Sequence, residues 1–436
     1  MLTEYSEKLR EEIHRTGLYL GTLLKWLIVA GVTGAVCGVI GSLFHIGVHE
    51  ASVLLAQHKR LLFCLPVSGL AIVGIYKLTG TEGLGTNDII EAVHEGKKLP
   101  FWLLPAIFAA TVLTHLCGGS AGREGAALQM GGTIGQSVGR RLGLDDRDLR
   151  IATLSGMAAF FSALFGTPLT AALFAIMVIS IGVLYHAAFV PCLTAALTAF
   201  GVSQLMGVEP TRFTVTAPAV ETFTFFRVAV LAALCAVVSM LFCSTVHQAE
   251  HLMKKKLPNP WLRAVAGGVL VIVLTLLVGN MQYNGAGMVV ITQAVEQGTA
   301  HPAAFLLKML FTAITLAAGF KGGEVVPSFF VGATFGCVAA PLLGLPAGFG
   351  AALGLVSVFC GATNCPVAST MLSIELFGAD GLLYFALSCG ISYMLSGYNG
   401  LYSSQTILYS KLKAQYINAK TNSHHAGDCD KPKEKA

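Results

Sequence analysis

Two glycine-rich stretches decide how this chain folds: GGSAGREGAALQMGGTIGQ at 118–136 and GFKGGEVVPSFFVGATFG at 319–336. In each, charged residues and several glycines stand just ahead of an apolar segment. A Gly-x₁₁-Pro segment follows both, at 156–168 and at 354–366, with one common offset of 198 residues. Chance likeness between Gly/Ala-rich apolar stretches would explain some of this similarity. The shared order of turn, helix, polar turn and Gly-x₁₁-Pro segment favours two homologous halves.

The composition surrounding these stretches excludes most soluble classes of protein. Of the 436 residues, 54% are hydrophobic and only 12% are charged, against roughly 25% charged in ordinary globular proteins. The mean hydropathy is +0.70. A chain this apolar cannot cover itself with polar surface in water, which excludes a soluble enzyme, a disulfide scaffold and a disordered regulator. The net charge of +5 is small for this length and gives no argument for nucleic acid.

Long runs without a charged residue predict membrane spans. A span needs about 20 apolar residues, so the two longest runs must each hold several crossings or re-entrant pieces. We therefore predict an all-α polytopic membrane protein, in which broken helices of two inverted repeats meet at the midplane. The runs cover 26–49, 99–122, 151–208, 228–249, 264–295, 325–374 and 381–410.

The predicted organisation has five parts. They are an N-terminal helix at 1–24, a first transmembrane repeat at 25–208, a connecting loop at 209–225, a second repeat at 226–418 and a disordered tail at 419–436. Basic residues gather in short polar segments, which by the positive-inside rule puts both termini in the cytoplasm. These residues are Lys8, Arg10, Arg15, Lys254, Lys255, Lys256, Arg263, Lys411 and Lys413.

Three glycine turns, at 80–88, 119–125 and 319–327, each precede a predicted helix start. Glycine lets backbone N–H groups approach a ligand closely. A helix N-terminus adds a partial positive charge and free N–H donors. If the three starts converge, the ligand is a small anion.

Glu124 and Glu324 lie within two of these turns. An ionised carboxylate among anion-binding N–H groups competes with the anion, and a protonated one vacates the site, which couples the anion to a proton. The simpler alternative is structural pairing, of Glu124 with Arg123 or Arg140 and of Glu324 with Lys321. We expect no cofactor, metal site or enzymatic activity, because no Cys/His cluster with metal spacing and no nucleophile with a nearby base stands out.

Several motifs resemble those of the CLC family of chloride channels and antiporters. The segment 122–125 with 129–132 is similar to the anion-binding GREGP…QxGG motif, and 156–159 with 168–169 is similar to GMAA…PL. The segment 400–403 resembles the one that carries the central-site tyrosine. The order and spacing hold over nearly the whole chain.

Departures from the chloride pattern resemble the fluoride-exporting branch of that family. Ala126 stands where chloride members have proline, and the segment 85–89 replaces the GSGIP motif. The segment 322–327 resembles the GGEV(T)P motif of the fluoride branch, although Val326 occupies the usual threonine position. The acidic pair that relays protons in chloride/proton exchangers is absent, and 175–179 is apolar instead.

The resemblance implies a role for particular side chains. Glu124 would be the external gating glutamate, and Glu324 would line the inner part of the path. Tyr402 would donate its hydroxyl to the central anion. Asn87 would supply an amide in place of the chloride-pattern serine, with Thr86 as the alternative by one residue. The remaining residues expected at the anion site are Gly122, Arg123, Gly125, Ala126, Val325, Val326 and Pro327.

The resemblance further implies an antiporter that exports fluoride in exchange for protons and so protects the cytoplasm. It implies a homodimer in the cell membrane, with one anion path per subunit, cytoplasmic termini and no CBS domains. Two alternatives stay open. One is a chloride channel or chloride/proton exchanger of the same fold. The other is an unrelated transporter with inverted repeats, for a carboxylate for example, which would need no titratable gate at Glu124.

Overall fold

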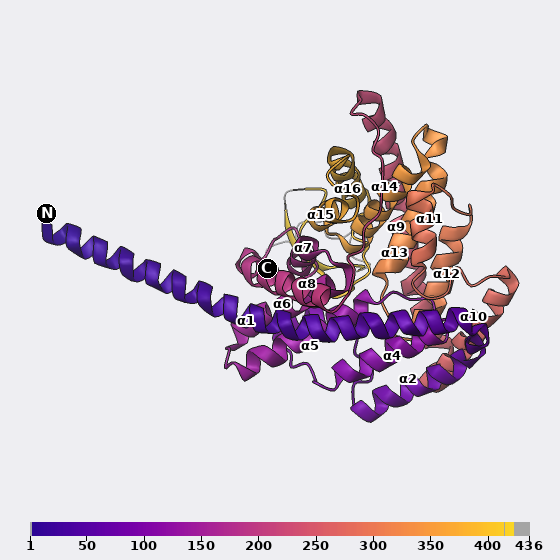
Figure 1. Cartoon of the computed structure of the whole chain (residues 1–436), viewed down its shortest axis with the longest axis horizontal. Helices are drawn as coiled ribbons and strands as arrows, with labels where there is room; N and C mark the ends of the chain where they lie inside the picture. Colours follow the sequence, from indigo (N-terminus) through magenta and orange to yellow (C-terminus); the bar gives the residue numbers. More distant parts are fainter. Residues whose placement is uncertain (1, 414, 423–436) are drawn as a thin grey trace, which may run out of the picture.

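The computed structural model describes residues 2–413 and 415–422, and Figure 1 shows the arrangement of the helices. The helices before residue 210 are α1 (Leu2–Gln57), α2 (Leu65–Thr79), α3 (Thr86–Glu95), α4 (Leu103–Leu116), α5 (Glu124–Arg141), α6 (Asp146–Phe165), α7 (Pro168–Met177) and α8 (Phe189–Leu205). Those after it are α9 (Thr222–Lys256), α10 (Pro260–Val278), α11 (Met288–Glu296), α12 (Ala304–Ala317), α13 (Val325–Ala339), α14 (Ala347–Thr363), α15 (Pro366–Phe377) and α16 (Leu382–Leu395).

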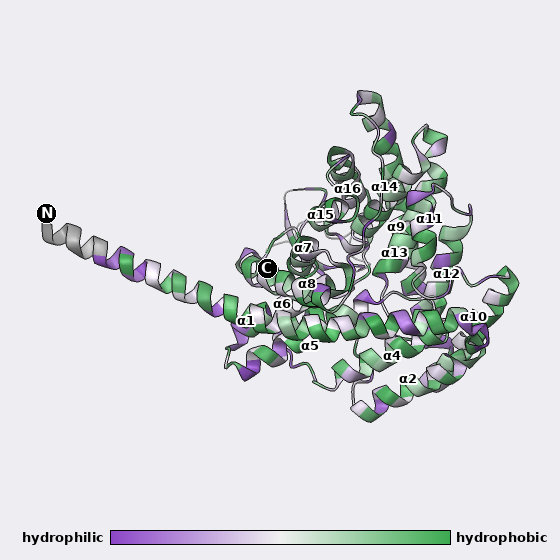
Figure 2. Ribbon diagram, viewed as in Figure 1, coloured by the Kyte–Doolittle hydropathy of each residue, from purple (hydrophilic) through white to green (hydrophobic). Residues whose placement is uncertain are grey.

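Six helical segments of the described chain are long and apolar enough to cross a membrane. Several of them carry exposed apolar side chains, such as Leu276 and Leu277 on the segment Pro260–Val278, and Figure 2 shows hydrophobic residues along much of the helical ribbon. These findings agree with the prediction of a polytopic membrane protein. The six segments are Arg10–Gln57, Lys59–Thr79, Asp146–Phe165, His186–Leu205, Thr222–Lys256 and Pro260–Val278.

Shorter apolar helices fill the interior of the molecule. α13 has 15 residues, which at 1.5 Å per residue is about 22 Å and shorter than a hydrocarbon core of about 30 Å. α14 is buried on every side from Phe349 to Thr363, and the longer α6 is buried in the same way from Ile151 to Phe165. Broken helices are therefore surrounded by protein, where their free ends can be satisfied.

The two predicted repeats share the same close helix packing. A Cβ atom on Gly131 of α5 would overlap the carbonyl oxygen of Gly156 on α6, and one on Gly332 of α13 would overlap that of Gly354 on α14. Backbone therefore packs on backbone at matching places in both halves. The bends that follow also match, because α6 ends at Gly166 with φ 70° and α14 ends at Asn364 with φ 59°.

The N-terminal helix continues without a break into the first span. α1 runs from Leu2 to Gln57, so the predicted boundary between residues 24 and 25 is not a structural one. No proline occurs in this segment, and the Thr16 and Thr22 hydroxyls donate back to carbonyls one turn earlier. The exposed first part of α1 projects away from the other helices in Figure 1.

A small sheet that sequence analysis did not predict lies near the end of the chain. Its strands are β1 (Ser180–Ile181), β2 (Thr406–Tyr409) and β3 (Tyr416–Lys420) in that order. β1 pairs parallel with β2, and β2 pairs antiparallel with β3.

The prediction that the disordered tail starts at residue 419 is wrong for residues 419–422. β3 continues to Lys420, and the Thr421 hydroxyl donates to the Tyr402 carbonyl at 2.6 Å. The Asn422 side chain exchanges hydrogen bonds with the backbone of Gly400. Non-local backbone pairing thus orders a polar segment whose composition alone indicates a tail. The rest of the predicted tail, 423–436, lies outside the described residues.

Candidate anion site

The starts of α5 and α13 meet across a short backbone pairing. Gly122 and Gly323 exchange both hydrogen bonds, with N–H···O distances of 2.7 and 2.8 Å. Neither position leaves room for a larger residue without displacing a neighbour. A Cβ atom on Gly122 would overlap Oε2 of Glu124, and one on Gly323 would lie 2.5 Å from the backbone nitrogen of Gly125. The pairing brings the N-terminal N–H groups of two helices to one place, as the convergence of glycine turns predicts.

The Glu124 carboxylate occupies this junction. Glu124 is the first residue of α5 and is fully buried. Its Oε2 accepts from the backbone N–H of Arg123 at 3.0 Å and from that of Val326, in the first turn of α13, at 3.2 Å. Its Oε1 has no hydrogen-bond partner among the described residues. The partial positive charge of a helix N-terminus favours a negative oxygen at this position, so the carboxylate sits where a small anion would also be stabilised.

The described residues do not support the structural pairing of Glu124. The Arg123 guanidinium donates to Nδ1 of His45 at 3.0 Å, and Arg140 donates to Gln136 at 2.6 Å. Within the described part of the chain, no ion pair joins Glu124 to either arginine. The carboxylate is held by backbone N–H groups, which are well suited to exchange one anion for another.

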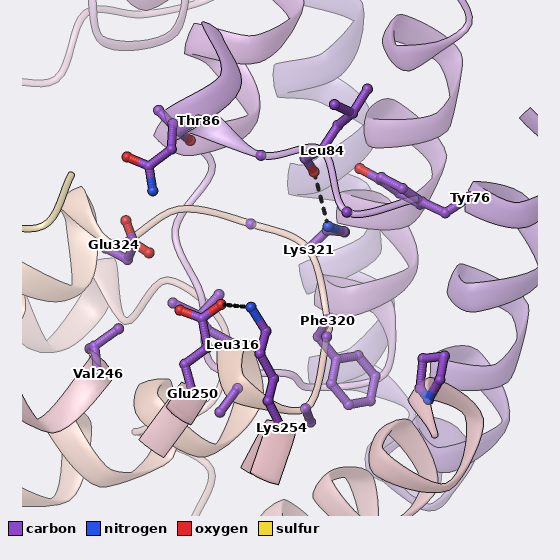
Figure 3. Close-up of a pocket in the computed structure, with 18 of the residues that line it drawn as sticks. Tyr76, Leu84, Thr86, Val246, Glu250, Lys254, Leu316, Phe320, Lys321 and Glu324 are labelled. Atoms are coloured by element: carbon purple, nitrogen blue, oxygen red, sulfur yellow. Dashed lines mark hydrogen bonds and ion pairs between the residues drawn. The ribbon is translucent and has the colours of Figure 1, made fainter. Parts of the chain in front are cut away.

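A cavity of about 840 Å³ opens beside this junction. Its wall comes from the start of α3, the last turns of α9, the loop ahead of α13 and residues 401–403, and Figure 3 shows part of that wall. Four of the predicted residues line it, namely Thr86, Asn87, Glu324 and Tyr402. Gln129, which shares α5 with Glu124, also lines it, so the inner end of the cavity reaches the helix that carries the buried glutamate.

Tyr402 presents a free hydroxyl in this region. The side chain is 1% exposed, and its hydroxyl oxygen has no hydrogen-bond partner among the described residues. Tyr402 lies in the loop between α16 and β2. Its carbonyl accepts from the Thr421 hydroxyl and from the Gln405 N–H. The last strand of the described chain therefore holds this loop in place.

Both Thr86 and Asn87 reach the cavity, so both remain candidates for the position of the chloride-pattern serine. The Thr86 hydroxyl contacts the Gly125 carbonyl and Nε2 of Gln129, each at 3.4 Å. Oδ1 of Asn87 accepts from the Ser404 backbone N–H at 3.1 Å, which fixes the amide plane and leaves its N–H₂ donors unused by that bond.

Glu324 stands immediately before α13 and lines the cavity. The predicted structural alternative, a pair with Lys321, is not present among the described residues. The Lys321 ammonium instead donates to the Leu84 carbonyl at 3.4 Å and lies 4.3 Å from the centre of the Tyr76 ring. Figure 3 shows Glu324 opposite Thr86, with Lys321 directed toward Leu84.

The other predicted residues occupy the first turns of the two helices. Gly125 and Ala126 in α5, and Val325, Val326 and Pro327 in α13, are all buried at the junction. Sequence analysis omitted Gln129 from the site, although the QxGG resemblance was a signal for it. It also omitted Ser404, for which no local signal exists because the residue acts through its backbone.

Comparisons with known proteins agree with this geometry. The family model described as voltage gated chloride channel matches residues 68–397. A chloride/fluoride channel protein of Pseudomonas syringae pv. tomato is 36% identical over 398 residues, which cover 89% of this chain and 88% of that protein.

Two solved structures show the same fold. A CLC-type fluoride/proton antiporter superposes with a TM-score of 0.85 at 32% identity, covering 88% of this chain and 98% of its own. A slow cyanobacterial Cl⁻/H⁺ antiporter superposes with a TM-score of 0.74 at 19% identity, covering 85% and 94%, which supports the fold alone. Because the family model spans well over half of the sequence and a relative above 30% identity covers most of it, the chain belongs to the CLC family of voltage-gated chloride channels.

Proposed function

We propose that this protein exports fluoride across the membrane in exchange for protons. One observation carries the proposal: the buried Glu124 carboxylate is held by backbone N–H groups of Arg123 and Val326, where the starts of α5 and α13 meet. Because this carboxylate is bound as an anion would be, it competes with an anion for the same N–H groups. Because it can also be protonated, this competition is sufficient to couple the anion to a proton.

The exchange follows from the charge of Glu124. When ionised, the carboxylate occupies the N–H groups at the helix N-termini and excludes the anion from them. When protonated, it loses most of its attraction for the N–H groups of Val326 and Arg123. The side chain then leaves, an anion takes its place, and the proton travels with the side chain. Each proton carried is thereby linked to the entry of an anion.

Glu324 is proposed as the proton carrier on the cavity side. It lines the same cavity as Tyr402, and no ion pair or hydrogen bond of its side chain occurs among the described residues. A carboxyl group without a fixed partner can accept a proton from water in the cavity and pass it toward Glu124. The Tyr402 hydroxyl, likewise without a partner, donates to the anion between them.

Fluoride is proposed as the anion rather than chloride for two reasons. Fluoride is small and strongly hydrated, so its site must replace water by several donors, and the helix N–H groups, the Tyr402 hydroxyl and the Asn87 amide supply them. The second is similarity: a solved CLC-type fluoride/proton antiporter is 32% identical, and a relative named for both chloride and fluoride is 36% identical. The same proposal includes a homodimer in the cell membrane with cytoplasmic termini. The basic residues Lys254 and Arg263 line the cavity, so by the positive-inside rule the cavity would face the cytoplasm.

Liposomes holding the purified protein test this function. Loaded with fluoride and diluted into fluoride-free buffer, they should release fluoride and take up protons in a fixed ratio. Chloride-loaded liposomes should release much less anion. Fast chloride release with proton uptake would indicate a chloride/proton exchanger, and release without any proton movement would indicate a channel. Cross-linking in native membranes should trap a dimer, and a monomer at every protein-to-lipid ratio would contradict that part.

A further inference from the structure

Lys321 is a cation of the cavity wall to which the proposed exchange assigns no role. It stands in the loop ahead of α13, three residues before Glu324, and it lines the cavity. Its ammonium has three N–H donors, and one of them reaches the Leu84 carbonyl at 3.4 Å. Among the described residues it forms no ion pair. Burying a cation without an anionic partner costs free energy. Lys321 is half-buried and has no such partner within the described residues, so its charge is available to an anion in the cavity.

The acidic groups near Lys321 are either occupied or held apart from it. Glu250 pairs with Lys254 at 2.6 Å, and the Asp88 carboxylate accepts from the backbone N–H of Gly85 at 2.8 Å. Glu324 lines the cavity but lies beyond ion-pair distance of Lys321. Figure 3 shows the Glu250–Lys254 pair on one side and Lys321 directed toward the turn at Leu84. Among the residues that the structure describes, no carboxylate is in contact with Lys321 to neutralise its charge.

The ammonium is also held in a fixed position. It lies 4.3 Å from the centre of the Tyr76 ring, a cation–π contact that keeps it against the wall. The Lys321 backbone N–H contacts the Thr114 hydroxyl at 3.3 Å. Lys254, in contrast, has a 58% exposed side chain whose charge is screened by water and neutralised by Glu250.

We propose that Lys321 draws small monovalent anions into the cavity and so sets the concentration at which the transporter is half-saturated from that side. The inference rests on the proposed function for the identity of the anion, but the attraction itself does not depend on it. A fixed cation in a cavity with low-dielectric walls raises the local concentration of counter-ions and their rate of entry. Once the anion has reached Tyr402 and the helix starts, Lys321 has no further part in the exchange.

The test uses membrane vesicles of uniform orientation, with Lys321→Gln, Lys321→Arg and the matched control Lys254→Gln. Each Gln variant removes one positive charge from the same cavity. Lys254 is paired with Glu250, whereas Lys321 has no carboxylate partner within the described part of the chain. Fluoride uptake is titrated at about 10 mM ionic strength, where the Debye length is about 30 Å, and at about 0.15 M, where it is about 8 Å, with potassium gluconate as the added salt.

At low salt, Lys321→Gln should raise the half-saturating fluoride concentration about tenfold with an unchanged maximal rate. The increase should shrink toward twofold at high salt. Lys321→Arg should behave as the wild type, and Lys254→Gln should change the value by less than about twofold. The effect should occur in inside-out vesicles, in which the cavity proposed to face the cytoplasm meets the bath, and not in right-side-out ones.

Other outcomes would overturn the inference. One such outcome is a lower maximal rate with an unchanged half-saturating concentration. Another is an increase in that concentration that salt does not alter. Either would mean that Lys321 only stabilises the contact between the loop ahead of α13 and the turn at Leu84. If the wild type transports chloride and no fluoride, the proposed function fails, but the same titration with chloride still decides the role of Lys321. If neither anion moves, both proposals fail.

Discussion

The starts of α5 and α13 are two versions of one local structure with different chemistry. Gly122 and Gly323 pair with each other across 201 residues of sequence, and both helices begin two residues after their glycine. In the first repeat the acid is the first helical residue, Glu124. In the second it stands one position earlier, as Glu324, in the place that Arg123 occupies in the first.

A shift of one residue separates the two carboxyl groups in space. Glu124 is fully buried and bound by N–H groups of both helix starts. Glu324 lines the cavity, and within the described residues its side chain forms no hydrogen bond or ion pair. Near-symmetric repeats can thus place one acid at the anion site and the other on the route to it, and the comparison predicts unequal effects when each is changed.

The largest effect is expected for Glu124→Gln. Glutamine cannot ionise, so it neither competes as an anion nor carries a proton. Proton influx driven by a fluoride gradient should vanish, while fluoride movement itself persists. The matched variant, Glu324→Gln, should reduce proton flux without removing it, because water in the cavity can still deliver protons. Undiminished proton flux in Glu124→Gln would refute the assignment of the gate.

Alanine at the paired glycines tests whether the two starts depend on each other. In Gly122→Ala the new Cβ would overlap the Glu124 carboxylate, and in Gly323→Ala it would press on the backbone nitrogen of Gly125. Overpacking of this kind costs about 1–3 kcal/mol. Both variants should lower thermal stability and fluoride efflux. Gly31→Ala on α1 is the control, since nothing lies within 4 Å of its added Cβ. Wild-type efflux in Gly122→Ala would contradict the close pairing.

Tyr402→Phe should have a smaller effect than either change at the helix starts. It removes one donor from the first shell of the anion, a loss of about 1 kcal/mol or roughly fivefold in affinity. Fluoride binding by isothermal titration measures this loss directly. Thr421→Ala should reproduce part of it, because the Thr421 hydroxyl holds the Tyr402 carbonyl at 2.6 Å. Unchanged affinity in Tyr402→Phe would remove this side chain from the anion site.

Asn87→Ser is expected to cause the smallest change, in selectivity rather than in rate. A hydroxyl takes less space than an amide and offers one O–H donor in place of two N–H donors, so chloride efflux should rise relative to fluoride efflux with the fold intact. Thr86→Ser is the matched control at the neighbouring position. A shift in the chloride-to-fluoride ratio with Thr86→Ser alone would exchange the roles of the two residues. No shift with either would move selectivity to Glu324 or to the turn at Gly83–Gly85.

Local patterns predicted much of the fold. The charge-free runs indicate the membrane spans, because burial in lipid excludes charge along a whole segment. The glycine turns and Pro327 indicate the helix starts, because these residue types are favoured by the local backbone conformation at such a start. The prediction of a disordered tail was wrong for residues 419–422 because the order there is not local. β3 is ordered by its pairing with β2, and nothing within the strand itself indicates that partner.

The sequence by itself determined that this chain spans a membrane, that it carries two related halves, and that Glu124, Glu324 and Tyr402 were the side chains to consider. Only the tertiary structure decided which groups these side chains contact. The pairing of Gly122 with Gly323, the hydrogen bond from Val326 to the Glu124 carboxylate and the contact of Lys321 with Leu84 all join residues far apart in the chain. Such contacts follow from how the helices pack together, and no window of local sequence contains that information.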